Sequence, residues 1–230
     1  MVNNLKVVIA AAGISSRMKG LTNKPYLLLN SRPILTYSLD VFEECSQVDE
    51  IIITANPKEI EYCKNEIVQR FGYNKVRKVI SGGKQRQDSV WNGLKSLEGE
   101  ADFVAIHDGA RPLLTLELFS MVLAAAEKWG AAVPAVAVHD TLKAIDNNGF
   151  IDCTLDRSRI MAVQTPQIFN YNKLMEAYKK AYEEEFASTD DASIFEKYCN
   201  RVKIVTGDNK NIKITTPEDL ITAEGFLNRG

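Results

Sequence analysis

Two cations follow a run of small residues near the start of the chain. Gly13 and Ser15 lie in the segment AAGISSRM, just after the apolar run Leu5–Ala12, and Arg17 and Lys24 come next. Small side chains let a backbone approach a ligand closely, and successive N–H groups in such a turn form a concave anion site. The pattern predicts a polyphosphate-binding loop at the end of a first β-strand. An ordinary strand-to-helix turn with two solvated cations is the alternative, because short motifs of this kind also occur without a ligand.

Two later segments place charged residues where a strand is expected to end. A glycine pair that ends at Gly83 leads into a helix with Arg86 and Ser89 in its first turns. Asp108 and Arg111 follow a second apolar run. A carboxylate at a strand end suits Mg²⁺, which takes one or two carboxylates and completes its shell with phosphate oxygens and water. A local ion pair between Asp108 and Arg111 is the competing interpretation.

Several well-known catalytic patterns are absent from the sequence. It contains neither a G-x-x-x-x-G-K-[ST] phosphate loop nor a G-x-G-x-x-G dinucleotide fingerprint. No Ser-His-Asp, Cys-His or paired-carboxylate arrangement stands out, and the cysteines at 45, 63, 153 and 199 form no C-x-x-C pair. The sequence therefore favours catalysis by positioning and electrostatics over a covalent mechanism.

Length, net charge and cysteine pattern limit the class of protein. The 230 residues suit a single α/β domain over 1–230, and 28 basic against 30 acidic residues give a net charge of −2. The chain therefore lacks the excess of basic residues that is typical of proteins that bind a nucleic-acid duplex. No stretch approaches the roughly 18 apolar residues of a membrane span, and the N-terminus does not resemble a signal peptide. Because the cysteine pattern also fits a reducing compartment, we expect a cytoplasmic protein that binds neither nucleic acid nor membrane.

Hydrophobic periodicity predicts strands that alternate with helices. The expected strands are Leu5–Ala12, Asp49–Ala55, Val76–Ile80, Asp102–His107, Ala131–Val138, Arg201–Thr206 and Asn211–Ile214. The expected helices are Pro33–Cys45, Pro57–Arg70, Gln85–Leu97, Leu116–Trp129, Asn172–Glu184, one that starts near Asp190 and one that starts after Thr216. Such alternation is typical of a doubly wound, mainly parallel α/β sheet with helices on both faces, whose ligands gather at the carboxyl ends of the strands. Pro134 is expected near an edge or a bulge.

Residues 139–165 break this alternation. An Asn-Asn-Gly turn at 147–149 lies between two short alternating segments, which predicts a β-hairpin. The stretch has little apolar content with which to build a core, and a hairpin of that size is marginal on its own. We therefore expect an arm that packs on a second copy of the chain and makes a twofold dimer.

The motifs together resemble the 2-C-methyl-D-erythritol 4-phosphate cytidylyltransferase family of the non-mevalonate isoprenoid pathway. The resemblance runs from about Val7 to Leu227 and rests on the order and spacing of short segments. These are Ala11–Met18, Lys24–Tyr26, Gly82–Val90, His107–Pro112, Asp140–Lys143, Leu155–Gln167, Thr189–Ser193 and Asn211–Leu220. The resemblance implies a Rossmann-like nucleotidyltransferase fold with a protruding β-arm. It also implies that CTP and methylerythritol phosphate react to give the CDP-alcohol and pyrophosphate.

The resemblance further implies roles for individual residues. The positions that match the CTP-binding residues are Ala11, Ala12, Gly13, Ser15, Gly83, Arg86 and Ser89. Arg17 and Lys24 would hold the triphosphate and stabilise the charge that grows on the α-phosphate, and Asp108 would lie beside Mg²⁺ or another divalent cation. The acceptor would be contacted by Asp108, Arg111, Thr165, Thr189 and Lys213, and from the partner's arm by Thr141 and Arg157. The catalytic cations would be Arg17, Lys24, Arg157 and Lys213.

No general base is required by this chemistry, because the attacking phosphate oxygen is largely ionised near neutral pH. Three alternatives stay open: a ribitol 5-phosphate cytidylyltransferase, a sugar nucleotidyltransferase that uses hexose 1-phosphates, and a non-catalytic CTP-binding sensor. The segments Asp140–Lys143 and Leu155–Arg159 look more like the methylerythritol enzyme than the ribitol enzyme. A sensor would have no use for Arg157, Thr189 and Lys213 on the acceptor side.

Overall fold

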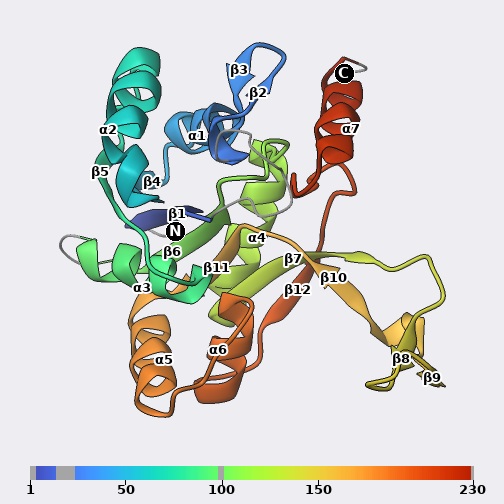
Figure 1. The fold of residues 1–230 in the computed structure, drawn as a ribbon. Coiled ribbons are helices and arrows are strands. Elements are labelled where there is room, and N and C mark those ends of the chain that lie inside the picture. Colours follow the sequence, from blue (N-terminus) through green and yellow to red (C-terminus); the bar gives the residue numbers. More distant parts are fainter. Residues whose placement is uncertain (1–3, 14–23, 98–100, 229–230) are drawn as a thin grey trace.

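The computed structural model describes residues 4–13, 24–97 and 101–228, and Figure 1 shows their arrangement. In these ranges eight strands form one sheet in the order β10-β7-β11-β6-β1-β4-β5, with β12 also paired to β7. The strands are β1 Leu5–Ala11, β4 Val48–Ala55, β5 Val76–Ser81, β6 Phe103–Asp108, β7 Ala131–Ala137, β10 Met161–Val163, β11 Gln167–Asn170 and β12 Lys203–Thr206. Strands β10 and β11 run antiparallel to their neighbours and the other pairs are parallel, so the sheet is mainly parallel, as predicted.

Helices cover both faces of the sheet (Figure 1), which confirms the doubly wound arrangement. One face carries α1 (Ile34–Glu44), α4 (Leu116–Trp129) and a segment that passes from a 3₁₀ turn (Pro57–Glu59) through α2 (Ile60–Tyr62) into a π-helical stretch (Cys63–Gln69). The other face carries α3 (Arg86–Ser96), α5 (Tyr171–Glu183) and α6 (Asp191–Tyr198).

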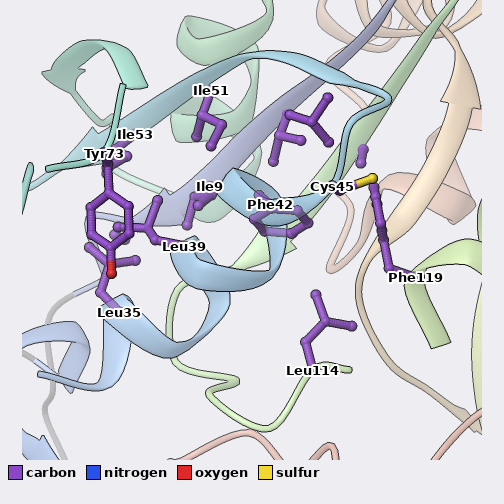
Figure 2. Close-up of a cluster of buried hydrophobic side chains, with 14 of the residues drawn as sticks. Ile9, Leu35, Leu39, Phe42, Cys45, Ile51, Ile53, Tyr73, Leu114 and Phe119 are labelled. Atoms are coloured by element: carbon purple, nitrogen blue, oxygen red, sulfur yellow. The ribbon is translucent and has the colours of Figure 1, made fainter. Parts of the chain in front are cut away.

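Strand β1 shows how the two cores arise from one sequence run. Successive side chains of a strand point to opposite faces. Val7 and Ile9 therefore join the core under α1 and α4, while Val8 packs toward α3 and α5. Figure 2 shows the first core, in which Phe42 of α1 and Phe119 of α4 meet edge to face with ring centroids 5.3 Å apart. Because both faces are covered, every side chain of the strand except the ion-paired Lys6 is apolar, and the strand's carboxyl end lies where the polyphosphate loop is predicted.

Pro134 lies inside β7, which has neighbours on both sides. Strand β12 pairs with one side of β7. On the other side β11 pairs with Ala131 and Ala132, and β10 pairs with Ala135–Ala137. Pro134 thus lies where the antiparallel partner changes from β11 to β10, and its missing N–H falls at an interruption of the hydrogen-bond ladder. That interruption is the physical reason why a strand with two neighbours tolerates proline here.

The predicted strand Asn211–Ile214 is wrong. Ile214 N–H donates to the Ala110 carbonyl at 2.9 Å, and the Asn211 carbonyl accepts from the Arg111 side chain at 2.7 Å. The segment lies beside the loop that follows β6, so its hydrogen bonds go to that loop rather than to a strand. Ile214 is buried and Lys213 is exposed, as the alternation predicts, but Asn211 is fully buried as well, so burial does not alternate over the whole segment.

A short hairpin and the last helix pack beside the 211–214 segment. A hairpin that the sequence analysis did not expect, β2 (Leu28–Leu29) with β3 (Arg32–Pro33), turns through Asn30 and Ser31. Both turn residues have positive φ, at 45° and 65°, as a tight hairpin turn requires. The last helix, α7 (Pro217–Leu227), begins as predicted with a Thr216 capping box.

The arm projects from the sheet as the predicted hairpin, β8 (Lys143–Ile145) with β9 (Ile151–Thr154) (Figure 1). Its return segment, β10, pairs with β7 and so belongs to the main sheet. Three large apolar side chains of the arm are mostly exposed, Ile145 at 65%, Phe150 at 72% and Ile151 at 64%. Across the described ranges no helix is both long and apolar enough to cross a bilayer.

Candidate active site

A cavity of about 910 Å³ opens where the carboxyl ends of β1, β4, β5 and β6 meet. Parallel strands present their carboxyl ends at one edge of the sheet, so loops distant in sequence converge there. The predicted site residues that line this cavity are Ala11, Ala12, Gly13, Lys24, Gly83, Arg86, Ser89, Asp108 and Lys213. Two predicted residues, Ser15 and Arg17, lie outside the residues that the structure describes.

One wall of the cavity is a closed turn built on the glycine pair. Ser89 Oγ accepts from Gly83 N–H at 3.0 Å and donates to a carbonyl of the same turn at 3.0 Å. A Cβ at Gly82 would lie 2.2 Å from the Cβ of Ala12, and one at Gly83 would lie 2.1 Å from the Cβ of Asp88. Glycine is therefore needed for the wall to pack against the end of β1. The Ser89 hydroxyl shapes this wall, and its contact with the cytidine stays a prediction.

Asp108, the last residue of β6, is the centre of the charged side chains. Its Oδ1 accepts from Arg86 Nε at 2.8 Å, and its Oδ2 accepts from Lys213 Nζ at 2.8 Å. Arg111 Nε lies 3.9 Å from Oδ2, so the local pair considered from the sequence is the longest of the three. The fold thus joins three segments that are far apart in the chain.

Arg86 is also bound by Asp191, a residue that was not predicted to belong to the site. Arg86 Nη2 donates to Asp191 Oδ2 at 2.8 Å, and Asp191 is fully buried in the first turn of α6. Tyr178 donates its hydroxyl to Asp191 Oδ1 at 2.5 Å. Asp191 lies in the Thr189–Ser193 segment that carries part of the family resemblance. The sequence does not show, however, that Asp191 is buried while its neighbour Asp190 caps the helix.

The charges of this cluster do not cancel. Among the described residues it contains the cations Arg86, Arg111 and Lys213 and the carboxylates Asp108 and Asp191, which leaves one surplus positive charge. Burial alone would raise the pKa of Asp108, but Arg86 and Lys213 outweigh it and hold that pKa well below its usual range. Asp108 is therefore ionised at neutral pH, and the surplus field suits an anionic ligand.

His107 and Thr165 lie buried beside Asp108 and support its backbone. Asp108 N–H donates to Thr165 Oγ1 at 3.1 Å, Thr165 Oγ1 lies 3.1 Å from His107 Nδ1, and His107 Nε2 lies 3.2 Å from the Arg111 carbonyl. A carbonyl can only accept, so Nε2 carries the proton and Nδ1 accepts from the Thr165 hydroxyl. Burial lowers the pKa of His107 from 6.5 to about 4, so the ring is neutral at pH 7. The contact of Thr165 with an acceptor stays a prediction.

The other predicted residues do not line the cavity. Arg111 Nε lies 3.9 Å from Asp108 Oδ2, and Thr189 lies in the loop just before the helix cap Asp190. Thr141 and Arg157 lie on the exposed arm, where Arg157 Nη1 donates to the carbonyl of His139. Within one chain, the arm residues are therefore separate from the cavity wall.

The carboxylates of the site could bind a divalent cation only if phosphate oxygens of a bound substrate supplied further ligands. The part of the chain that the structure describes holds no group of three or more His, Cys, Asp or Glu that could bind a metal by itself. Asp108 offers one carboxylate, a number that Mg²⁺ commonly takes when phosphate oxygens and water complete its shell. Both Asp108 oxygens are paired with cations here. Asp108 would therefore hold a divalent cation only together with phosphate oxygens, which could take over Lys213 as their partner.

Known proteins resemble this chain over its whole length. The sequence model of the family described as "IspD: 2-C-methyl-D-erythritol 4-phosphate cytidylyltransferase" matches residues 5–229. A 2-C-methyl-D-erythritol 4-phosphate cytidylyltransferase from Caldanaerobacter subterraneus subsp. tengcongensis is 45% identical over 226 residues, which cover 98% of this chain and 100% of the relative. One from Clostridium acetobutylicum is 44% identical over 222 residues and 96% of each chain. The crystal structure of 4-diphosphocytidyl-2C-methyl-D-erythritol synthase from Anaerococcus prevotii has a TM-score of 0.86 at 34% identity, covering 99% of this chain and 97% of the other.

Proposed function

Because the chain belongs to the 2-C-methyl-D-erythritol 4-phosphate cytidylyltransferase family and carries that activity in the non-mevalonate isoprenoid pathway, we propose that the cavity beside Asp108 is where CTP and the methylerythritol phosphate react. The family match favours this activity over ribitol 5-phosphate or hexose 1-phosphate transfer and over a CTP sensor. The observation that carries the proposed location is the buried charged cluster, whose Lys213 reaches the cavity.

The reaction joins two anions. An oxygen of the acceptor phosphate attacks the α-phosphorus of CTP, a new P–O bond forms, and the bond from the α-phosphorus to the bridging oxygen breaks to release pyrophosphate. The attacking oxygen is ionised near pH 7, so no side chain has to remove a proton. The protein has to hold both anions in line and offset the charge that grows on the leaving group, a task that fixed cations perform well.

The nucleotide half of the proposed site lies at the end of β1 and along the glycine-pair wall. Ala11, Ala12 and Gly13 would contact CTP through backbone groups, and Lys24 would pair with the triphosphate. Gly83, Arg86 and Ser89 would face the cytidine. Ser15 and Arg17 belong to the same proposed set. The support for this half is that the described members of the set line one cavity.

The acceptor half would lie around Lys213. This residue is the cation that we expect to bind the acceptor phosphate, with Asp108, Arg111, Thr165 and Thr189 around it. Thr141 and Arg157 would complete this half from the arm of a second copy of the chain. The support for a dimer is that the arm exposes a row of large apolar side chains, which is typical of a surface that another chain covers.

Asp108 is the residue that would hold Mg²⁺ or another divalent cation, together with phosphate oxygens. When bound, such an ion neutralises phosphate charge. The chain contributes a carboxylate that is rigid, 8% exposed and ionised at neutral pH.

The test is pyrophosphate release from CTP and Mg²⁺, run in parallel with 2-C-methyl-D-erythritol 4-phosphate and ribitol 5-phosphate. Release with the first acceptor alone is expected. Release with ribitol 5-phosphate alone would move the protein to that pathway, and CTP binding without release would support the sensor. To locate the site, Lys213→Ala should abolish most of the release, while Lys210→Ala, an exposed lysine nearby, should not.

A further inference from the structure

Arg86 is fixed between two carboxylates that come from different parts of the fold. Its Nε binds Asp108 Oδ1 and its Nη2 binds Asp191 Oδ2, each at 2.8 Å. The Arg86 side chain is 22% exposed, whereas that of Lys213 is 40% exposed. Of these two cations on Asp108, Lys213 is thus the one with more freedom to move, and Arg86 is the one held by a second acid.

Asp191 itself is rigid. It is 0% exposed, its Oδ1 accepts from Tyr178 OH, and its backbone N–H donates to Gln167 Oε1 at 3.1 Å. Tyr178 is also fully buried, and its ring stacks on Trp91 of α3 with centroids 5.6 Å apart. The carboxylate that holds Arg86 is therefore anchored to α5, β11 and α6 rather than to the cavity loops.

We propose that Asp191 is a positioning residue: it holds Arg86 on Asp108 Oδ1 and thereby leaves Lys213 as the cation that passes from Asp108 Oδ2 to a substrate phosphate. Asp108 is buried, and a buried carboxylate that loses all its partners is strongly destabilised. Arg86, kept in place by Asp191, compensates Asp108 while Lys213 serves the substrate. This inference rests on the proposed function, since it takes Lys213 to be the phosphate-binding cation.

Neutralising Asp191 should add positive charge to the cavity. In Asp191→Asn, Arg86 loses one of its two anionic partners and adds its charge to the cavity that Lys213 already serves. Arg86 then competes for phosphate oxygens, so anions bind more tightly but in a geometry that does not favour in-line attack. We expect kcat to fall about tenfold or more, KM for CTP to fall by up to about twofold, and pyrophosphate to inhibit at a concentration about threefold lower or less.

The experiment measures kcat, both KM values and the pyrophosphate inhibition constant for wild type, Asp191→Asn, Tyr178→Phe and Ile194→Val. Ile194 is a buried core residue of the same helix, so its variant lowers the melting temperature and reports stability loss alone, with kcat and inhibition unchanged. Tyr178→Phe keeps the ring and removes one bond to Asp191. It should shift kcat and inhibition in the same directions as Asp191→Asn, by about twofold to fivefold.

Three results would overturn the inference. They are a folded Asp191→Asn with wild-type kcat, a loss of kcat without tighter pyrophosphate inhibition, and, if Asp191→Asn does not fold, a Tyr178→Phe that matches wild type in both constants. Failure of the proposed function is distinguishable, because wild type itself would then release no pyrophosphate with methylerythritol phosphate.

Discussion

Lys213 and Asp108 form a 2.8 Å ion pair although they are 105 positions apart in the sequence. The pair joins unlike partners, because the Asp108 side chain is 8% exposed and that of Lys213 is 40% exposed. Asp108 is fixed at the end of β6, while Lys213 stands on a loop at the cavity. If Lys213 binds a substrate phosphate as proposed, that phosphate would replace Asp108 as its partner, and the carboxylate would orient the ammonium before the substrate binds.

Lys213→Ala is expected to reduce turnover by on the order of 10²–10³, by analogy with the loss of one preorganised donor to a developing anion. The acceptor KM should rise more than the affinity for CTP falls, because Lys24 and the end of β1 remain. Steady-state kinetics with each substrate varied, together with CTP titration by calorimetry, separate the two effects. An unchanged acceptor KM and kcat would remove Lys213 from the acceptor site.

His107 is expected to make stability depend on pH. Its folded pKa of about 4 lies below the ordinary 6.5, so the neutral ring is favoured by folding. The resulting stability is fully present above pH 6.5 and is lost as the pH falls toward 4, by about 2 kcal/mol between pH 7 and pH 5. Urea unfolding at these two pH values should show a smaller loss for His107→Gln, whose side chain does not titrate. Equal losses in the two proteins would contradict this account of His107.

Much of the fold could be predicted because its signals are local. The apolar run of β1 indicates a strand covered on both faces, and Thr216 followed by Pro217 marks the start of α7. The Asn211–Ile214 segment shows the limit. Its alternation of polar and apolar residues does not say whether a strand lies alongside, and here the neighbour is a loop, which also buries Asn211.

In the candidate site, too, some features could be predicted from the sequence and others could not. Asp108 and Arg86 could be singled out by charge and position at strand ends, whereas Lys213 was indicated only by the family resemblance, which also supplied the roles of all three. Their pairing could not be predicted, because the bond from Arg86 to Asp191 depends on how α6 docks against α3, 105 residues earlier in the chain. The bond between the Thr165 hydroxyl and His107 likewise follows from tertiary packing, whereas the Ser89 hydroxyl bonds within its own turn.

Gly82→Ala is expected to disturb the nucleotide half of the site. The added Cβ would lie 2.2 Å from the Cβ of Ala12 and 2.8 Å from Ser89 Oγ, so the wall or the end of β1 must shift. We expect KM for CTP to rise about tenfold and the free energy of unfolding to fall by about 1–3 kcal/mol. Kinetics and chemical unfolding measure the two.

Gly225→Ala is the matched control for this change. Gly225 lies in α7, and a Cβ there would meet nothing within 4 Å. Alanine should raise the free energy of unfolding by up to about 1 kcal/mol, because glycine is a poor helix former, and leave KM for CTP unchanged. A Gly82→Ala protein with a wild-type KM would show that this wall does not bear on the nucleotide.

The arm is expected to form the contact between two copies of the chain. Ile145 and Ile151 pair across β8 and β9 and are 65% and 64% exposed, so they form an apolar patch that a second copy would cover. If the arm joins two copies as proposed, Ile145→Ser with Ile151→Ser should convert the dimer to monomers in light scattering. Turnover should fall as well, because Thr141 and Arg157 would no longer reach a neighbouring cavity. Ile221→Ser, on α7 and 69% exposed, should leave the dimer intact. A double variant that stays dimeric would place the contact between copies elsewhere and leave the arm without this role.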